Sequence, residues 1–219
     1  NNVNRGTATV TINGKGNYTG KVEETFQSTP KMPEKDVDYK VVLPADPIYD
    51  GKPREASVWT RTGVGEVTVW YNDSTALPVH AGTYNVAVEI ASSDNFSAVK
   101  RMDIGSFSIN RRTISLDTTA LKIEDKTYNG RDDDAKISGL AFSNLPDGAV
   151  LSEGTDYTLA TRYASAEAGE RDVTITVTLA NENYTLKDGN CIVKGKILPK
   201  TVELVVIAKD AVYTGLPYS

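Results

Sequence analysis

Few side chains in this chain could support catalysis. His80 is the only histidine and Cys191 the only cysteine among the 219 residues, so a zinc site built from several of these residue types is excluded. A nucleophilic triad needs a histidine between a nucleophile and an acid, and no Gly-x-Ser-x-Gly motif occurs. We interpret His80 as a loop residue and Cys191 as a small strand residue rather than a reactive thiol. The sequence therefore predicts no catalytic residue, no cofactor and no enzymatic activity.

The densest group of possible metal ligands is an acidic run. Asp132, Asp133 and Asp134 follow Arg131 directly. Calcium prefers several oxygen ligands gathered in one site, whereas consecutive side chains of an extended segment point to opposite sides. The spacing also differs from that of an EF-hand loop. We predict a solvated loop, with a calcium site at Asp132, Asp133 and Asp134 as the weaker alternative.

Two tryptophans are the best candidates for binding a ligand. Residues 58–61 and 66–71 are interpreted as a hairpin around Gly63, Val64 and Gly65. That pairing would place Trp59 and Trp70 diagonally on one face of the sheet, with the valines and Tyr71 on the core face. Outward indole rings could stack on a sugar or on a protein partner. The alternative is that the two rings cover an edge of the domain or a junction between domains.

The elements that would position these residues are alternating strands. Apolar residues recur at every second position in residues 7–12, 84–90 and 173–179, which is typical of half-buried β-strands. A glycine precedes each strand, and an asparagine-aromatic pair follows it. The glycines are Gly6, Gly82 and Gly169, and the pairs are Asn17-Tyr18, Asn95-Phe96 and Asn183-Tyr184. We expect each glycine to adopt a backbone angle that other residues avoid, and each aromatic ring to pack under the turn that ends the strand.

These signals repeat along the chain. The asparagines lie 78 and 88 residues apart, and a Tyr-x-Gly turn recurs as Tyr49-Asp50-Gly51, Tyr128-Asn129-Gly130 and Tyr213-Thr214-Gly215. A period of about eighty residues indicates a tandem array of small domains. We predict an all-β fold of tandem Ig-like β-sandwich domains, with a β-grasp-like, mostly-β repeat as the alternative.

The predicted domain boundaries follow from this period. They are a C-terminal remnant of a preceding repeat at residues 1–28, a linker at 29–38, one β domain at 39–112, a second at 113–203, and the start of a further repeat at 204–219.

Two stretches resemble known repeat families. Residues 44–110 resemble an MBG-type repeat, on the segments Ile48-Tyr49-Asp50-Gly51-Lys52-Pro53, Ala81-Gly82-Thr83-Tyr84-Asn85-Val86, Asp94-Asn95-Phe96-Ser97 and Gly105-Ser106-Phe107-Ser108-Ile109. Residues 113–203 resemble the related YDG-type repeat, on Lys126-Thr127-Tyr128-Asn129-Gly130, Asn183-Tyr184-Thr185-Leu186 and Gly195-Lys196-Ile197-Leu198-Pro199-Lys200. Asn129 stands where the YDG type carries aspartate. The resemblance implies a secreted or surface-located bacterial protein, and it brings no catalytic residues.

The charge composition excludes one class of binding partner. The net charge of −5 and the pI near 5.0 argue against nucleic acid, because phosphate contacts need clustered Lys and Arg. The sequence has no apolar run long enough to enter a membrane. We expect a structural stalk segment that holds other domains away from the cell. The alternatives are an adhesin module for a host glycan or matrix protein, and an accessory domain of a secreted polysaccharide-active enzyme.

Neighbouring repeats of the same chain are the first partners that the array predicts. The partial repeats at residues 1–28 and 204–219 would also leave strand edges without a partner, and exposed edges tend to pair with other chains. We therefore expect end-to-end self-association through these two segments.

Overall fold

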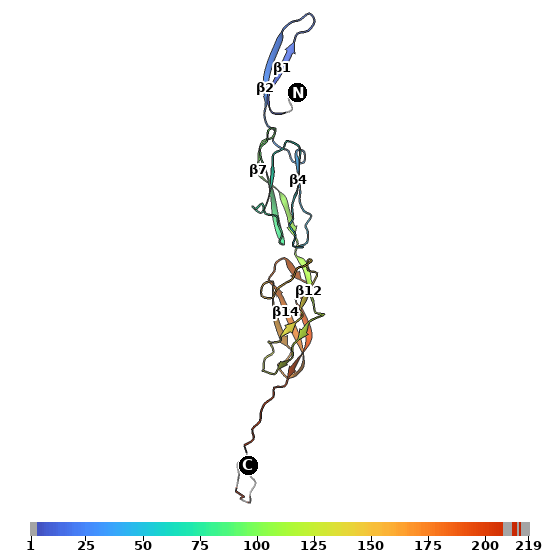
Figure 1. Cartoon of the computed structure of the whole chain (residues 1–219), viewed down its shortest axis with the longest axis vertical. Coiled ribbons are helices and arrows are strands. Elements are labelled where there is room, and N and C mark those ends of the chain that lie inside the picture. The colour runs from blue at the N-terminus through green and yellow to red at the C-terminus, as the bar shows by residue number, and fades with distance from the viewer. Residues whose placement is uncertain (1–3, 208–211, 214, 216–219) are drawn as a thin grey trace. The chain divides into compact units, whose positions relative to one another are not determined.

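The computed structural model describes residues 4–207, 212, 213 and 215, and all of their regular structure is β (Figure 1). The all-β prediction is confirmed. Within these residues no helix could cross a membrane. The chain divides into two compact units: unit 1 contains residues 1–115, 143–157 and 179–187, and unit 2 contains residues 116–142, 158–178 and 188–219.

Unit 1 begins with a two-stranded hairpin. Strand β1 (Gly6–Asn13) pairs antiparallel with β2 (Lys21–Ser28), in a register that sets Gly6 opposite Ser28. Of the three alternating apolar residues of β1, Ala8 is buried, but Val10 and Ile12 are exposed, Ile12 to 65%. The expectation of a half-buried strand is therefore wrong for these two residues. An isolated hairpin has no second layer to cover its apolar face.

Residues 39–109 form a sandwich of two sheets within unit 1. Strands β3 (Tyr39–Val42) and β4 (Ser57–Thr60) form one sheet, and β5 (Val67–Tyr71), β6 (Gly82–Ile90) and β7 (Val99–Ile109) form the other. Alternate residues of β6 face inward, since Val86, Val88 and Ile90 are fully buried. Tyr39 of the first sheet packs against Val88 and Ile90 of the second. The core therefore lies between the two layers.

The predicted hairpin of residues 58–61 and 66–71 is wrong. Strand β4 pairs with β3, and β5 pairs with β6, so the two segments lie in different sheets. The connecting loop lies against the end of β6, where the Ala91 amide donates to the Glu66 carbonyl at 2.9 Å. A Cβ at Gly65 would come within 1.9 Å of the Ala91 carbonyl oxygen. Gly65 thus lets the chain cross from one layer to the other instead of turning back.

The strands that follow β7 form three sheets. The first contains β8 (Arg112–Asp117), β12 (Ala141–Ser143) and β15 (Tyr184–Leu186). The second has four strands in the order β10 (Lys126–Thr127), β16 (Asn190–Leu198), β14 (Gly169–Leu179) and β13 (Tyr157–Tyr163). The third pairs β9 (Lys122–Ile123) with β11 (Ile137–Ser138). In unit 2, a Cβ at Gly195 would come within 2.8 Å of the Ile123 side chain, so β9 packs closely over β16.

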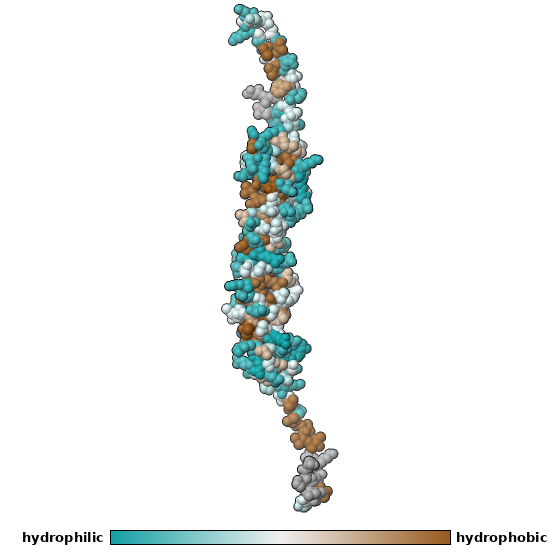
Figure 2. All heavy atoms as spheres, turned by 180° about the vertical axis from the view of Figure 1, so that it is seen from behind, coloured by the Kyte–Doolittle hydropathy of each residue, from teal (hydrophilic) through white to brown (hydrophobic). Residues whose placement is uncertain are grey.

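Beyond β16 the described chain has no regular structure through residue 207. Several of its side chains are apolar and exposed, and Figure 2 shows the brown part of this segment. They are Val202, Leu204, Val205, Val206 and Ile207. The predicted start of a further repeat at residues 204–219 falls partly outside the described residues, and the predicted domain boundaries stay predictions.

A glycine opens a strand at three places in the chain. Gly6, Gly82 and Gly169 each open a strand, opposite Ser28, Ile109 and Ile197 respectively. Their φ angles are +143°, +156° and +128°, a region that side chains other than hydrogen rarely occupy. This confirms the role predicted for the three glycines. Because each glycine occupies the same place in its strand, residues at the same distance from Gly6, Gly82 and Gly169 are treated below as equivalent.

Candidate functional site

The two tryptophans do not come together as predicted. Trp59 lies on β4 opposite Lys40 and is 55% exposed. Trp70 lies on β5 in the other sheet, is half-buried, and has the guanidinium of Arg101 at 4.8 Å from its ring centroid. Arg101 also forms an ion pair with Asp73 at 2.6 Å. One ring is therefore open to solvent and the other is covered by a cation. Ligand binding at Trp59 and Trp70 stays a prediction.

The acidic run is neutralised by neighbouring cations. Asp132, Asp133 and Asp134 each pair with a different basic side chain, which are Arg162 at 3.1 Å, Arg131 at 3.1 Å, and Lys126. The hydrogen bonds from Arg131 and from Lys126 lower the pKa values of Asp133 and Asp134 respectively. In the part of the chain that the structure describes, no group of three His, Cys, Asp or Glu residues could hold a metal ion.

Cys191 is half-buried on β16 opposite Ile175. Burial raises the pKa of its thiol, which disfavours the reactive thiolate. His80 lies in the loop before Gly82, and its carbonyl accepts a hydrogen bond from the Tyr84 hydroxyl at 2.9 Å. The His80 ring has a partner of its own: its Nδ1 lies 3.2 Å from Nδ2 of Asn183. The sequence did not reveal this contact.

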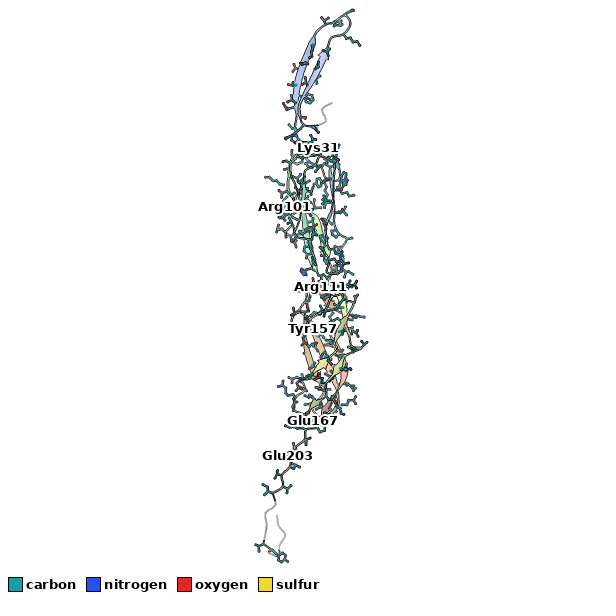
Figure 3. The ribbon with its side chains drawn as sticks, in the orientation of Figure 1. Lys31, Arg101, Arg111, Tyr157, Glu167 and Glu203 are labelled. Atoms are coloured by element: carbon teal, nitrogen blue, oxygen red, sulfur yellow. The ribbon has the colours of Figure 1, made fainter. Side chains whose placement is uncertain are left out.

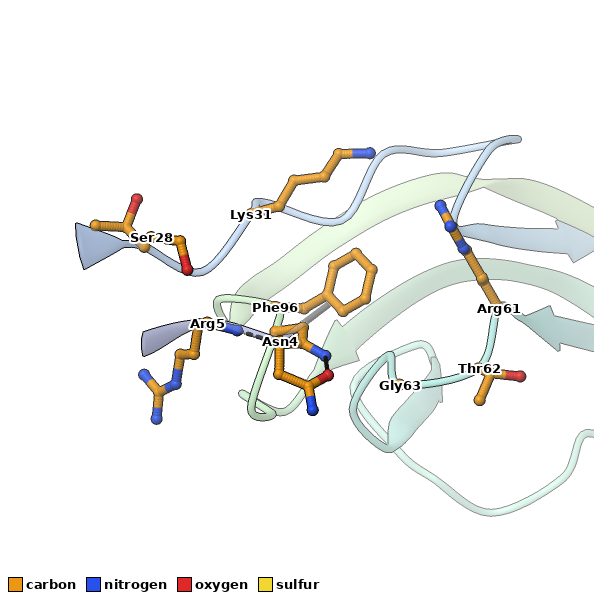
Figure 4. A pocket seen from close by; sticks show the side chains of 10 residues that line it. Asn4, Arg5, Ser28, Lys31, Arg61, Thr62, Gly63 and Phe96 are labelled. Atoms are coloured by element: carbon orange, nitrogen blue, oxygen red, sulfur yellow. Dashed lines mark hydrogen bonds between the residues drawn. The ribbon is translucent and has the colours of Figure 1, made fainter. Parts of the chain in front are cut away.

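Asn95 joins the base of the hairpin to the loop after β6. Its Oδ1 accepts a hydrogen bond from the Arg5 amide at 2.8 Å, and its Nδ2 donates to Oδ1 of Asn4 at 2.9 Å (Figure 4). Its carbonyl accepts from the Lys31 amide, and the Lys31 carbonyl accepts from the Ser97 amide, both at 2.9 Å. We call this set of contacts the first junction.

Asn183 makes the equivalent contacts elsewhere in unit 1. Its Oδ1 accepts from the Ala81 amide at 2.8 Å, its Nδ2 faces His80, and its carbonyl accepts from the Arg112 amide at 2.9 Å. We call this set the second junction. Arg5 and Ala81 each directly precede a strand-opening glycine, Gly6 or Gly82. The asparagine of the sequence repeat therefore satisfies the same backbone N–H group in both places.

The basic residues of the two junctions are also equivalent. Lys31 and Arg112 each lie three residues after the strand partner of the opening glycine, Ser28 or Ile109. Lys31 bridges in parallel to Phe96, and Arg112 to Tyr184. In both junctions the chain that leaves one strand pair thus runs beside the aromatic residue of the next repeat.

The aromatic residue of the second junction packs on a Tyr-x-Gly turn. The rings of Tyr184 and Tyr49 meet edge to face, with centroids 5.4 Å apart and an interplanar angle of 85°. Arg112 donates from Nε to the Tyr49 carbonyl at 2.9 Å. We expected the ring to pack under its own turn, which stays a prediction. Its ring partner is the tyrosine of another repeated motif, more than a hundred residues earlier.

A cavity of about 600 Å³ lies beside the first junction. Lys31, Arg61 and Phe96 are among its lining residues, as Figure 4 shows. Behind it Asp38 is fully buried, accepting from Lys31 at 2.6 Å and from the Glu34 amide at 3.0 Å. The hydrogen bond from Lys31 is the main cause that lowers the pKa of Asp38.

Sequence reasoning missed Asp38, although a signal was present. The dipeptide Asp38-Tyr39 recurs as Asp156-Tyr157. Asp156 accepts from the Ser152 amide at 2.8 Å, four residues earlier, as Asp38 does from Glu34. The asparagines were noticed only as markers of the repeat. Their contacts could not be seen because the partners lie 90 and 102 residues away.

Comparison with known proteins agrees with this description of residues 44–109. That stretch matches the family model of the MBG domain, a repeat module of surface proteins. No curated protein and no solved structure matches the chain. The YDG-type resemblance of residues 113–203 stays a prediction. The stretch from residue 44 to residue 109 is thus similar to the MBG domain family, and the MBG-type resemblance is confirmed.

Proposed function

We propose that this chain is a non-catalytic structural segment of a bacterial surface or secreted protein, which presents other domains away from the cell. The observation that carries the proposal is the junction. Asn95 and Asn183 repeat the same hydrogen bonds to the residue before a strand-opening glycine. A chain that joins its repeats by one recurring contact is suited to act as a spacer.

The chemistry of the junction supports this role. Each asparagine uses its side-chain oxygen, its side-chain nitrogen and its backbone carbonyl, so one residue joins two segments through three contacts. A hydrogen bond of this kind contributes about 0.5–1.5 kcal/mol net. The contacts are polar and can form in water as each repeat folds. None of them needs a ligand or a metal ion.

The spacer function can be tested by display. A reporter domain is attached to a bacterial surface through this chain or through an unstructured Gly/Ser linker of the same number of residues, and its capture by antibody-coated beads is measured at equal surface density. We expect faster capture with this chain, because an unstructured linker coils back toward the cell. Equal capture with the two tethers would overturn the proposal.

A second candidate function rests on one observation, the 55% exposure of Trp59 on β4. A flat exposed ring beside Lys40 could bind a host glycan or a matrix protein. The test is a glycan and matrix-protein array probed with multivalent protein, because multivalency raises weak affinities. Binding that Trp59→Ala abolishes and that Met32→Ala, at another exposed apolar side chain, leaves intact would support the adhesin function. An array without any specific signal would count against it.

A further inference from the structure

We propose that the Gly169 end of unit 2 binds the Asn17-Tyr18 turn of a second copy of this chain, through a third junction of the type that Asn95 and Asn183 make. This inference rests on the proposed function in one respect, namely that repeats are joined by this contact. The spacer function itself does not require a second copy of the chain as a partner. Both halves of the contact are present on one chain.

The receiving half is the segment that leads into Gly169. Counting from the strand-opening glycine, Ala168 is equivalent to Arg5 and Ala81, whose amides bind the junction asparagines. In the described part of the chain the Ala168 amide donates no hydrogen bond. Ala168 is half-buried, and its amide is available to donate to an incoming side-chain oxygen.

Glu167 completes the polar part of the receiving half. It lies two residues before Gly169, as Asn4 lies before Gly6 and His80 before Gly82, and it is exposed (Figure 3). Asn4 and His80 both face the Nδ2 group of a junction asparagine. A carboxylate oxygen is a strong acceptor for such an N–H group. Glu167 can thus make the same contact as these two residues.

Tyr128 provides the aromatic part. Its amide donates to the Leu198 carbonyl at 2.8 Å, as the Tyr49 amide donates to the Asn110 carbonyl. Leu198 and Asn110 each directly follow the strand partner of an opening glycine. Tyr128 is therefore equivalent to Tyr49, which receives the Tyr184 ring, and Tyr128 itself is 37% exposed. The basic residue is present too, because Lys200 follows Ile197 by three positions.

The incoming half is the tip of the hairpin. Tyr18 is 79% exposed, whereas the equivalent Tyr184 of the second junction is only 5% exposed. In the described residues the Asn17 side chain makes no hydrogen bond, while Asn95 and Asn183 use both side-chain polar atoms. The tip thus presents an unused asparagine and an uncovered ring, which are the two groups that the receiving half lacks.

The expected contacts follow by analogy. Asn17 Oδ1 accepts from the Ala168 amide, Asn17 Nδ2 donates to the Glu167 carboxylate, and the Tyr18 ring packs on Tyr128. Because the two surfaces differ, the contact is heterologous and joins copies head to tail without closing a pair. Association should therefore continue beyond dimers as concentration rises.

The test is sedimentation velocity of the whole chain from micromolar to millimolar concentration. We expect the average mass of the wild type to rise with concentration, and Asn17→Ala to weaken association about tenfold. The matched control is Asn13→Ala, which changes the same residue type in the same hairpin. On the receiving side Glu167→Lys should weaken association, while Glu170→Lys, with the same charge change on an exposed strand residue, should not. Circular dichroism confirms that each variant is folded.

Three outcomes would overturn the inference. The first is a wild type that stays monomeric up to millimolar concentration. The second is an Asn17→Ala variant that associates as strongly as the wild type. The third is association that Val22→Thr abolishes and Asn17→Ala does not, which would assign the contact to the exposed apolar face of the hairpin. None of these results bears on the display experiment, in which single tethers are compared, so the spacer function and this inference can fail independently.

Discussion

At the scale of single residues, the junction asparagines carry the most specific chemistry in this chain. Each accepts a hydrogen bond from a backbone N–H group that has no strand partner. That N–H group belongs to the residue directly before the glycine that opens a strand. A side chain that covers such an N–H group must replace the hydrogen bond that the group made to water, because a buried N–H group without an acceptor destabilises the fold. Asparagine fits because it accepts and donates through one rigid amide.

Substitution of Asn183 should expose the Ala81 amide. We expect Asn183→Ala to speed hydrogen exchange of that amide about fivefold, since the lost hydrogen bond contributes about 1 kcal/mol. Asn183→Asp keeps an acceptor oxygen for Ala81 and loses only the donor toward His80. It should therefore retain most of the protection. Exchange measured by NMR would contradict this if both variants lost protection equally.

Asp38 should make the stability of unit 1 depend on pH. Its pKa is lowered, chiefly by the hydrogen bond from Lys31, so its stabilising contribution is present above the unfolded-state pKa of about 3.9. The contribution is lost as the pH falls through the lowered folded-state value. We expect Asp38→Asn to reduce the free energy of unfolding near neutral pH, and the difference from wild type to shrink below pH 4.

Urea unfolding between pH 2 and pH 7 measures this dependence. Asp36→Asn is the control, because Asp36 is exposed two residues earlier and should change the free energy of unfolding little at any pH. A difference between wild type and Asp38→Asn that stays constant across this range would contradict the assignment.

At the scale of elements, the same strand position is buried in one repeat and exposed in another. Ile12, Val88 and Ile175 each lie six residues after an opening glycine. Val88 and Ile175 are fully buried, whereas Ile12 is 65% exposed. The strand pattern is the same in all three, and the difference arises from the layer that covers β6 and is lacking over β1.

This difference predicts unequal costs for one substitution. Ile175→Ala should destabilise unit 2 by about 2–5 kcal/mol, through lost apolar burial and the cavity left behind. Ile12→Ala should change stability by less than about 0.5 kcal/mol, as expected for an exposed position. Chemical denaturation of the two variants measures both values. Equal losses of unfolding free energy in the two variants would show that the hairpin face is covered in solution. If the loss for Ile12→Ala then depended on protein concentration, a second copy would be what covers it.

At the scale of the whole molecule, the chain is acidic, and its densest acidic run is paired locally. The net charge is −5, yet the three consecutive aspartates each have their own cation. Local pairing of this kind leaves little field to attract nucleic acid or anionic lipid. It also leaves the described residues without a gathered set of acidic ligands.

Thermal unfolding of the whole chain should therefore be independent of divalent cations. We expect the same Tm in a chelator and in millimolar calcium, because a site that binds only the folded state would otherwise raise Tm by mass action. Differential scanning calorimetry checks this. A rise of several degrees with calcium, lost in Asp134→Asn, would instead place a calcium site at the acidic run.

The sequence by itself determined that the long alternating segments form strands and that a glycine opens each of them. These are local properties: a period of two fixes the inward face, and a glycine with positive φ fixes the start. Tertiary structure decided which strand pairs with which. Alternation marks a face but names no partner, so the sequence could not show that β4 joins β3 instead of β5. For the same reason Trp59 and Trp70 were expected on one face and lie in different sheets. The junctions and the buried Asp38 depend on contacts between distant segments, and only the folded chain brings those side chains within hydrogen-bonding distance.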